Sequence, residues 1–394
     1  MLQIMTKTID LKFSDHFPLS SKQKDWQIKA AEFASQVSVD SIIEADQNNI
    51  FPYPLFEKAC QTGFGSLPFK PGYGGQDGDY VSFALVNEVM ARKSIPIMSS
   101  LGVHVLCQEP IYSFGTVSQK EKYLIPSACG KFLGAFGLTE PMAGSDTANI
   151  QTQAKPVDNG YLLNGSKVFI TSGASAHYYI VMARLNINTS EAIPKDTITA
   201  FIVEANSNGL SIGQKFDMLG MRGYSTCELV FSDCFVPVNN LLGLPYQGRK
   251  VALSSLAKGR ITIASQAVGW AYGALDAVNA YFNRHPQSLK KSHYEQIGKL
   301  VSLSLSAKVK TLEAARLVDS GNLSVKDSSI AKWHATDIAM QVASEAMNII
   351  GLHSQDKQLL LEKIYRDAKA GQIYEGTNQI QRMLVGKYLN SPSI

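Results

Sequence analysis

The sequence predicts a mainly α-helical protein with an antiparallel β-domain in the middle of the chain. Thirteen of its 15 prolines precede residue 246 and none lies between Pro286 and Pro392, so the last third can form long helices. Runs rich in β-branched and aromatic residues, separated by turn residues, are confined to the middle. Apolar residues at helical spacing dominate the beginning. We therefore expect a helical domain at 1–130, a β-domain at 131–246 and a helical bundle at 247–394.

Within these regions the pattern predicts individual elements. Helical spacing in the first region predicts helices at 26–43, 80–93 and 118–128. β-Branched and aromatic runs in the middle predict strands at 161–171, 178–184, 197–205 and 227–236. Alanine-rich apolar faces in the last region predict antiparallel helices at 253–281, 296–317 and 328–350, with breaks at Ser320-Gly321 and near Gly351.

Composition excludes several classes of protein. The 37 basic and 33 acidic residues are interspersed and give a net charge of +4, so neither a nucleic-acid surface nor a polybasic membrane anchor is indicated. The five cysteines form no C-x-x-C pair, which favours a reducing compartment and argues against a zinc site. Residues 1–13 lack a signal-peptide pattern, and no run of eighteen apolar residues occurs. These features predict a cytoplasmic protein without a membrane segment.

Common catalytic motifs are absent or out of context. Neither G-x-G-x-x-G nor G-x-x-x-x-G-K-[ST] occurs, so nicotinamide binding by a doubly wound sheet and P-loop chemistry lack support. The stretch 209–213 matches the hydrolase pattern G-x-S-x-G, but residues 214–223 show no helical face, so we interpret Ser211 as a turn residue. His104 lies in a helical stretch and is interpreted as a core residue.

The stretch 373–382 places one carboxylate, Glu375, between Tyr374 and Gly376. A carboxylate beside apolar groups loses solvation, which raises its pKa toward the range useful for a general base near neutral pH. Asn378 and Gln381 have the spacing of a capping box, so we expect the last helix to begin at about Gln379. The alternative is a carboxylate that only complements a helix dipole.

Two further clusters suit a flat cofactor. Residues 134–147 are dense in glycine and hydroxyl groups, and Gly144 with Ser145 can present N–H groups and a hydroxyl to a phosphate or a planar heterocycle. Phe169 stands two residues before Thr171, hence on the same strand face, and combines an aromatic wall with a hydrogen-bonding group. A plain loop is the alternative for residues 134–147.

Taken together, these segments resemble the acyl-CoA dehydrogenase family of flavoproteins, from about Leu19 to the C-terminus. The resemblance implies an N-terminal helical domain, a middle β-domain and a C-terminal four-helix bundle. Five stretches carry it in the family's order, namely 138–141 with 143–146, 221–223 through 241–243, 258–260, 366–369 and 373–382.

The resemblance also implies a reaction and its residues. Glu375, placed as in short- and medium-chain members, would remove the α-proton of an acyl thioester such as an acyl-CoA. A hydride would leave the β-carbon for FAD, giving a trans-2-enoyl thioester. Some members carry the base just before the bundle arginine, but that position is Gly259 here. The implied FAD-binding residues are Phe136, Leu138, Thr139, Gly144, Ser145, Phe169, Thr171, Arg284, Gly351, Thr377 and Asn378. The implied substrate-binding residues are Ser145, Arg260, Tyr374 and Gly376. For Phe136, Leu138 and Phe169, ordinary core packing is the alternative.

Several departures from the family pattern leave alternatives open. The family's Arg-x-x-Phe-Gly becomes Arg284 followed by His-Pro-Gln-Ser, and its Gly-Gly-x-Gly becomes Gly351 followed by Leu-His-Ser. Both segments are expected to hold the flavin of a neighbouring subunit in a homodimer or homotetramer. Phe169 replaces a frequent tryptophan, and Ala257 replaces a common acidic residue near the thioester carrier. The alternatives are the same chemistry on an acyl or peptidyl carrier protein, or a flavin-free interaction subunit. The family expectation for the electron acceptor is an electron-transfer flavoprotein, with direct use of oxygen as the other option.

Overall fold

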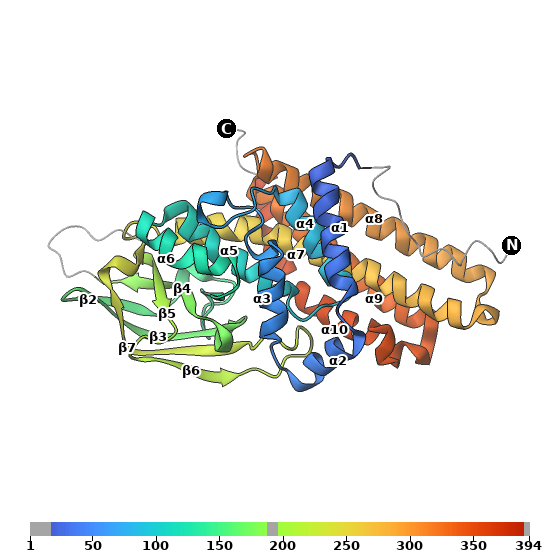
Figure 1. The fold of residues 1–394 in the computed structure, drawn as a ribbon, viewed down its shortest axis with the longest axis horizontal. Coiled ribbons are helices and arrows are strands. Elements are labelled where there is room, and N and C mark those ends of the chain that lie inside the picture. Colours follow the sequence, from blue (N-terminus) through green and yellow to red (C-terminus); the bar gives the residue numbers. More distant parts are fainter. Residues whose placement is uncertain (1–16, 187–195, 390–394) are drawn as a thin grey trace.

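The structure, a computed structural model, describes residues 17–186 and 196–389 (Figure 1). Figure 1 shows the β-sheet at one end of the molecule and the long helices α8 and α9 at the other, with α7 running between them. This is the predicted fold class, and the order helices, sheet, helices is confirmed.

In the described part of the chain, six α-helices precede the sheet. They are α1 (Ser21–Ser35), α2 (Val39–Asn48), α3 (Tyr53–Gln61), α4 (Tyr80–Arg92), α5 (Met98–Phe114) and α6 (Val117–Ala128). The prediction of one helix at 26–43 is wrong, because Ser38 interrupts it: its side chain accepts a hydrogen bond from Ser41 N at 3.2 Å and caps a new helix. His104 on α5 is a core residue, as expected. Its ring lies 3.1 Å from Ser127 O and accepts from Gly134 N at 3.2 Å.

The middle of the chain forms an eight-stranded sheet in the order β6-β7-β3-β2-β4-β5-β8, with β1 also paired to β4. The strands are β1 (Gly134–Gly137), β2 (Gln153–Val157), β3 (Gly160–Ile170), β4 (Tyr178–Leu185), β5 (Ile198–Glu204), β6 (Leu210–Lys215), β7 (Cys227–Pro237) and β8 (Leu241–Leu242).

Two details of the sheet differ from the prediction. β4 pairs in parallel with β1 and β2, so the sheet is mixed rather than wholly antiparallel. The reason is the β2–β3 hairpin, which returns the chain so that β4 again runs in the direction of β2. Ser211 is a strand residue on β6 opposite Val230 and not a turn residue, because β7 offers it a partner strand.

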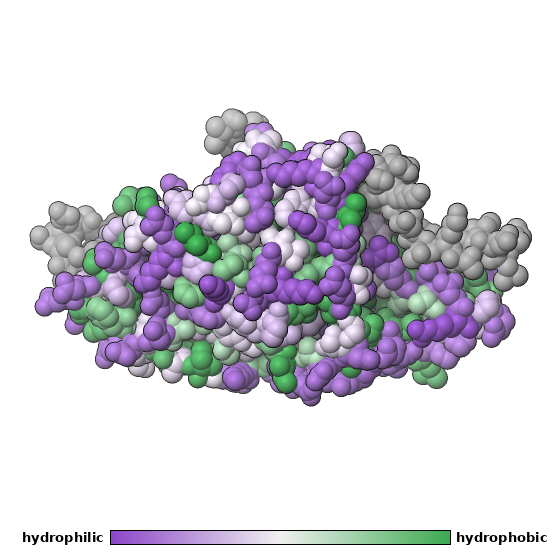
Figure 2. Space-filling view, viewed as in Figure 1, coloured by the Kyte–Doolittle hydropathy of each residue, from purple (hydrophilic) through white to green (hydrophobic). Residues whose placement is uncertain are grey.

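Five helices follow the sheet, namely α7 (Gly248–Arg284), α8 (Lys291–Asp319), α9 (Val325–Ile350), α10 (Leu361–Gly371) and α11 (Asn378–Leu389). Their core is continuous with that of the first helices: Trp270 of α7 and Leu85 of α4 belong to one cluster of buried apolar side chains. In the described residues, no helix combines the length and apolarity needed to cross a membrane. The face in Figure 2 is mostly polar, with apolar residues in small separate groups.

The three regions meet at the buried carboxylate of Asp367 on α10. It accepts hydrogen bonds from Ser94 Oγ at 2.9 Å and from the backbone N–H of Met221 at 2.6 Å, and it pairs with Lys363 Nζ at 2.6 Å. One carboxylate therefore joins the end of α4, the loop after β6 and the bundle. Both members of the ion pair are buried, and the next carboxylate, Asp46, lies 4.0 Å from Lys363 Nζ. Losing Asp367 therefore leaves a buried ammonium with only this longer contact.

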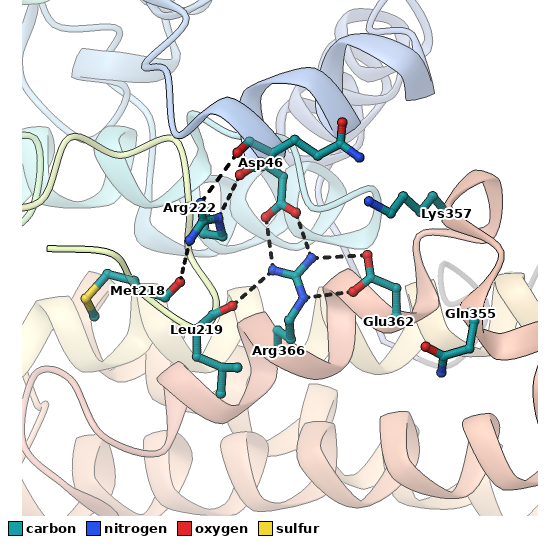
Figure 3. Close-up of a pocket in the computed structure, with 9 residues that line it drawn as sticks. Asp46, Met218, Leu219, Arg222, Gln355, Lys357, Glu362 and Arg366 are labelled. Atoms are coloured by element: carbon teal, nitrogen blue, oxygen red, sulfur yellow. Dashed lines mark hydrogen bonds and ion pairs between the residues drawn. The ribbon is translucent and has the colours of Figure 1, made fainter.

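A hollow of about 510 Å³ lies beside this junction (Figure 3). Arg366 reaches across it and pairs with Asp46 at 2.7 Å and with Glu362 at 2.8 Å, and its Nη1 donates to Leu219 O at 3.0 Å. Arg222 donates to Asp46 O at 2.8 Å. The charged groups that cross the hollow already have partners, so it serves as a joint between domains rather than as a reaction site.

We expect Asp367→Ala to lower the free energy of unfolding by about 3–5 kcal/mol, because the buried Lys363 loses its close partner and keeps only Asp46 at 4.0 Å. Denaturant midpoints of the two proteins measure the change. Glu345→Ala is the matched control, since it breaks the exposed Lys299–Glu345 pair and should cost less than about 1 kcal/mol. Equal losses in the two variants would contradict the role assigned to Asp367.

Candidate active site

Glu375 lies in the loop between α10 and α11. α11 begins at Asn378, and Thr377 Oγ1 accepts a hydrogen bond from Ile380 N at 3.3 Å. Thr377, not Asn378, therefore caps this helix, and the predicted capping box between Asn378 and Gln381 is wrong. The reason is that the buried Asn378 side chain turns into the bundle, where Thr336 and Asp337 accept hydrogen bonds from its Nδ2 at 2.9 and 2.7 Å.

The backbone at the carboxylate is held in an uncommon conformation. Glu375 has φ 51° and Gly376 has φ 94°, both in the left-handed region. Glycine adopts this region freely, whereas a glutamate there needs support from its surroundings. Gln381 Nε2 donates to the carbonyls of Glu375 and Gly376 at 3.2 and 3.0 Å. Lys332 Nζ of α9 donates to the Gly376 carbonyl at 2.9 Å. The bundle thus fixes where the Glu375 side chain points.

The carboxylate occupies space that a glycine leaves open on α7. A Cβ atom placed at Gly259 would lie 2.3 Å from Glu375 Oε2 and 3.1 Å from Leu106 of α5. Oε2 itself is buried and has no hydrogen-bond partner. Burial raises the pKa of Glu375 to about 7, against the opposing effect of the charges on Lys332 and Arg260. A carboxylate with this pKa and a free oxygen is suited to proton transfer at neutral pH.

Two buried cations face this carboxylate. Arg260 of α7 has an unpartnered Nε, and its Nη1 lies 3.5 and 3.4 Å from the hydroxyls of Ser328 and Ser329. Lys332 is completely buried. Burial lowers the pKa of Arg260, and it lowers that of Lys332 to about 7 although Glu375 opposes the shift. The site therefore holds one carboxyl group, one amine and one guanidinium group away from water.

A network of hydrogen bonds connects the loop that contains Glu375 to the sheet. Tyr374 OH donates to Gln266 Oε1 at 2.9 Å, and Ser99 Oγ donates to the same oxygen at 3.2 Å. The next residue on α5, Ser100, lies 2.7 Å from the hydroxyl of Ser172, just beyond β3. The end of β3 and the loop that contains Glu375 are therefore both connected by hydrogen bonds to the start of α5.

A buried ion pair fixes the two strand segments singled out in the sequence. Lys167 Nζ of β3 contacts Glu140 Oε1 at 2.7 Å and Leu138 O at 3.1 Å, and Val168 N donates to Thr139 O at 2.9 Å. Burial lowers the pKa of Lys167 to about 8. Burial opposes the ionisation of Glu140, but the Lys167 ammonium outweighs it and lowers the pKa of Glu140. Sequence reasoning assigned no role to this pair. Its signal is a lysine inside a β-branched run.

The predicted cofactor residues of the sheet are partly open to solvent. Phe169 has φ 57°, is 55% exposed and stacks on Phe216 with ring centroids 4.5 Å apart. Phe136 and Leu138 are half-buried and pack against the apolar core on one face of the sheet, so the core-packing alternative accounts for part of their surface. Thr139 and Thr171 are half-buried, and Gly144 and Ser145 are exposed.

Arg284 and Gly351 lie far from the carboxylate along the bundle. Arg284 stands 25 positions after Gly259 on the same helix, which corresponds to about 37 Å. It pairs with Asp356 at 3.5 Å, and Gly351 is exposed with φ 60°. The structure does not bring these two residues to Glu375 within one chain.

Comparison with known proteins agrees with this arrangement. Three family models match the chain: the N-terminal domain of acyl-CoA dehydrogenase at residues 20–131, the middle domain at 135–234 and the C-terminal domain at 246–389. A short-chain-specific acyl-CoA dehydrogenase of Megasphaera elsdenii is 38% identical over 380 residues, covering 94% of this chain and 98% of that protein. The chain belongs to the acyl-CoA dehydrogenase family.

Solved structures of this family have the same fold. Butyryl-CoA dehydrogenase from Megasphaera elsdenii is 37% identical, with a TM-score of 0.90 over 95% of this chain and 100% of that chain. A structure from work on the electron-transferring flavoprotein of Acidaminococcus fermentans is 36% identical, with a TM-score of 0.91 and the same coverage. The resemblance inferred from the motifs is thus confirmed for the family and the fold.

We expect Gly259→Ala to lower kcat by about 100-fold, because the added methyl group displaces the flexible end of Glu375 and a small misplacement of a reacting group is costly. The fold should persist, since only that carboxylate and Leu106 have to move. Steady-state kinetics and thermal unfolding measure the two effects. Gly298→Ala on α8, where a Cβ meets nothing within 4 Å, is the control. Full activity in Gly259→Ala would show that the carboxylate position does not matter.

Proposed function

We propose that the protein is an FAD-dependent acyl-CoA dehydrogenase with Glu375 as its catalytic base. One observation carries the proposal: Glu375 Oε2 is buried, has no partner and belongs to a carboxyl whose pKa is about 7. A permanently paired carboxylate would be a weak base, and an exposed one would be ionised but poorly directed. The family of the chain agrees with this assignment.

The chain's own residues account for the proton transfer. Glu375 Oε2 takes the α-proton of the acyl thioester and becomes a neutral carboxylic acid, a form that burial favours. The N–H of Glu375 donates to the thioester oxygen, where negative charge develops. The chemistry that bound FAD would supply is hydride acceptance from the β-carbon, so that the thioester would lose one proton and one hydride and gain a double bond. Arg260, Tyr374 and Gly376 flank the thioester.

The residues present fit a flavin. The exposed ring of Phe169 and the half-buried hydroxyl groups of Thr139 and Thr171 offer a flat ring an aromatic wall and hydrogen bonds. A Cβ at Gly144 would meet no other atom within 4 Å, which leaves room for a phosphate beside Ser145. The residues proposed to hold FAD within one chain are Phe136, Leu138, Thr139, Gly144, Ser145, Phe169, Thr171 and Thr377. Among solved relatives, PigA was determined with FAD and proline.

Asn378 is better explained as support for the loop. Its amide donates to Thr336 and Asp337, its Oδ1 accepts from Lys332 Nζ at 2.9 Å, and its N–H donates to Gln372 O at 3.0 Å. Because these groups are engaged within the bundle, we assign Asn378 an indirect role in placing Thr377.

Two similar relatives are named as short-chain-specific enzymes, and one solved relative is a butyryl-CoA dehydrogenase. We therefore propose a short-chain acyl-CoA, such as butyryl-CoA, as the substrate. Ser145 is proposed to contact its CoA portion. These names do not favour a carrier-protein substrate or a flavin-free role.

We expect butyryl-CoA to bleach the flavin absorbance of the purified protein. The Glu375→Gln variant should retain bound flavin, but its flavin should be reduced at least about 1,000-fold more slowly, because the amide cannot accept the proton. Stopped-flow absorbance under anaerobic conditions measures both. Butyryl-pantetheinyl carrier protein is the comparison substrate. Near-normal reduction of Glu375→Gln would refute the base, and reduction only by the carrier-bound substrate would refute acyl-CoA.

The electron acceptor and the assembly are also proposed from the relatives. We propose an electron-transferring flavoprotein as the acceptor, since one similar structure comes from work on such a protein. We propose a homodimer or homotetramer in which Arg284 and Gly351 contact the flavin of the partner subunit. The separation of about 37 Å along α7 supports this, since it places Arg284 beyond the site of its own chain. A cytoplasmic location stays a prediction.

Arg284→Ala is expected to raise the Kd for FAD by about tenfold, because the variant loses one charge-assisted hydrogen bond. The rate of flavin reduction at saturating FAD should change little, because Arg284 lies far from Glu375. Fluorescence titration of the apoprotein and light scattering measure affinity and assembly. Lys299→Ala, at another exposed ion pair of the bundle, is the control. A monomeric protein that binds FAD with unchanged affinity in Arg284→Ala would refute this arrangement.

A further inference from the structure

We propose that Lys332 is a positioning residue for the catalytic base: it anchors the Glu375–Gly376 turn to α9 and supplies the positive charge that favours the ionised form of the Glu375 carboxylate. The inference rests on the proposed function of Glu375 as a base. It concerns a residue that carries no substrate or flavin contact in the function proposed above.

The anchoring follows from two hydrogen bonds. Lys332 Nζ donates to Gly376 O and to Asn378 Oδ1, each at 2.9 Å. One acceptor directly follows the base, and the other belongs to the first residue of α11. A single ammonium group therefore spans the turn that contains the left-handed Glu375 and Gly376 residues. Because Lys332 is completely buried, this ammonium has lost its hydration and depends on these acceptors.

The electrostatic role follows from where the buried charge lies. Lys332 favours ionisation of Glu375 more strongly than Arg260 does, and Glu375 in turn favours the charged form of Lys332. Arg260 opposes that charge, whereas Asp337 supports it. Other titratable groups near this cluster are Cys107 on α5, Tyr374 in the loop, Asp367 on α10 and Tyr388 on α11.

Other buried lysines of the described chain differ in their partners. Lys167 and Lys363 contact carboxylates directly, at 2.7 and 2.6 Å. Lys332 instead donates to a carbonyl and an amide oxygen, so no direct ion pair neutralises its charge. That charge is held at the carbonyl of the residue after Glu375, and it favours the ionised form of Glu375, whose Oε2 has no hydrogen-bond partner of its own. Such an arrangement tunes a base without blocking it.

The test measures the ionisation of Glu375 directly. Infrared difference spectra between the FAD-loaded protein and its Glu375→Gln variant isolate the carboxylic acid band of Glu375, which is followed across neutral pH without substrate. In the wild type we expect a midpoint near 7, assigned to the coupled pair of Glu375 and Lys332. In Lys332→Met the midpoint should rise by about one pH unit or more, because a nearby opposite charge has been removed.

The direction of this shift in the Glu375 midpoint also predicts the kinetic result. The acid limb of kcat/KM requires ionised Glu375, so in Lys332→Met it should move to higher pH by the same amount. Thr336→Val is the matched control: it removes another hydrogen bond to Asn378 from the same helix face, with no change of charge. It should leave the midpoint within about 0.3 pH units, the scatter expected when no charge changes.

Lys332→Met should still fold, since Gln381 still donates to Gly376 O and Thr336 to Asn378 Oδ1. If that variant does not fold, Lys332→Gln, which keeps a donor without the charge, is measured with the same expected rise. An unchanged midpoint in the lysine variant, or an equal rise in Thr336→Val, overturns the proposal. Failure of the wild type to oxidise any acyl-CoA would instead refute the proposed function and leave the infrared result standing.

Discussion

The Glu375 carboxylate reaches its position only because α7 has no side chain at Gly259. A Cβ atom at position 259 would lie 2.3 Å from Oε2, so the Glu375 carboxylate occupies the space that a side chain on α7 would need. The same helix approaches α4 just as closely one segment later, where a Cβ at Gly269 would lie 2.3 Å from Glu88 O. At these two glycines the backbone of α7 therefore packs against the Glu375 carboxylate on one side and against the N-terminal helices on the other. The geometry of the site depends on both of these close approaches.

Burial raises the pKa of Glu375 into the range of a general base, but it also makes an ionised carboxylate costly to hold in the interior. Buried carboxylates such as Asp367 and Glu140 are satisfied by direct ion pairs and backbone N–H groups. At Glu140 these partners together outweigh burial and lower the pKa of the carboxyl. Glu375 differs because its cationic neighbours act through space while its Oε2 keeps no partner. This contrast distinguishes the structural carboxylates from the proposed base within one protein.

The order of helices and strands could be predicted from periodicity and proline placement, since both report local structure. Glu375 could be singled out from the motif at 373–382, but its position and its pKa depend on Gly259, Arg260 and Lys332, which are distant in sequence. Pairing direction could not be predicted, because β4 lies beside β1 and β2 through connections that local pattern does not encode. The role of Asn378 was misjudged for a related reason. A short amide near a helix start favours capping unless the tertiary structure offers buried partners, and here Lys332 and Thr336 do.

Two of the departures from the family pattern lie far from Glu375 along α7. The altered segments follow Arg284 and Gly351, and in this structure Tyr281 contacts both substituted histidines, with ring centroids 4.9 Å from His285 and from His353. This aromatic group occupies the end of α7 that is remote from Gly259. Changes there can alter subunit contacts or the hold on a partner's cofactor, while Glu375, Gly259 and Lys332 keep their arrangement. The proposed proton abstraction and the proposed contact with a partner's flavin therefore lie at opposite ends of one helix.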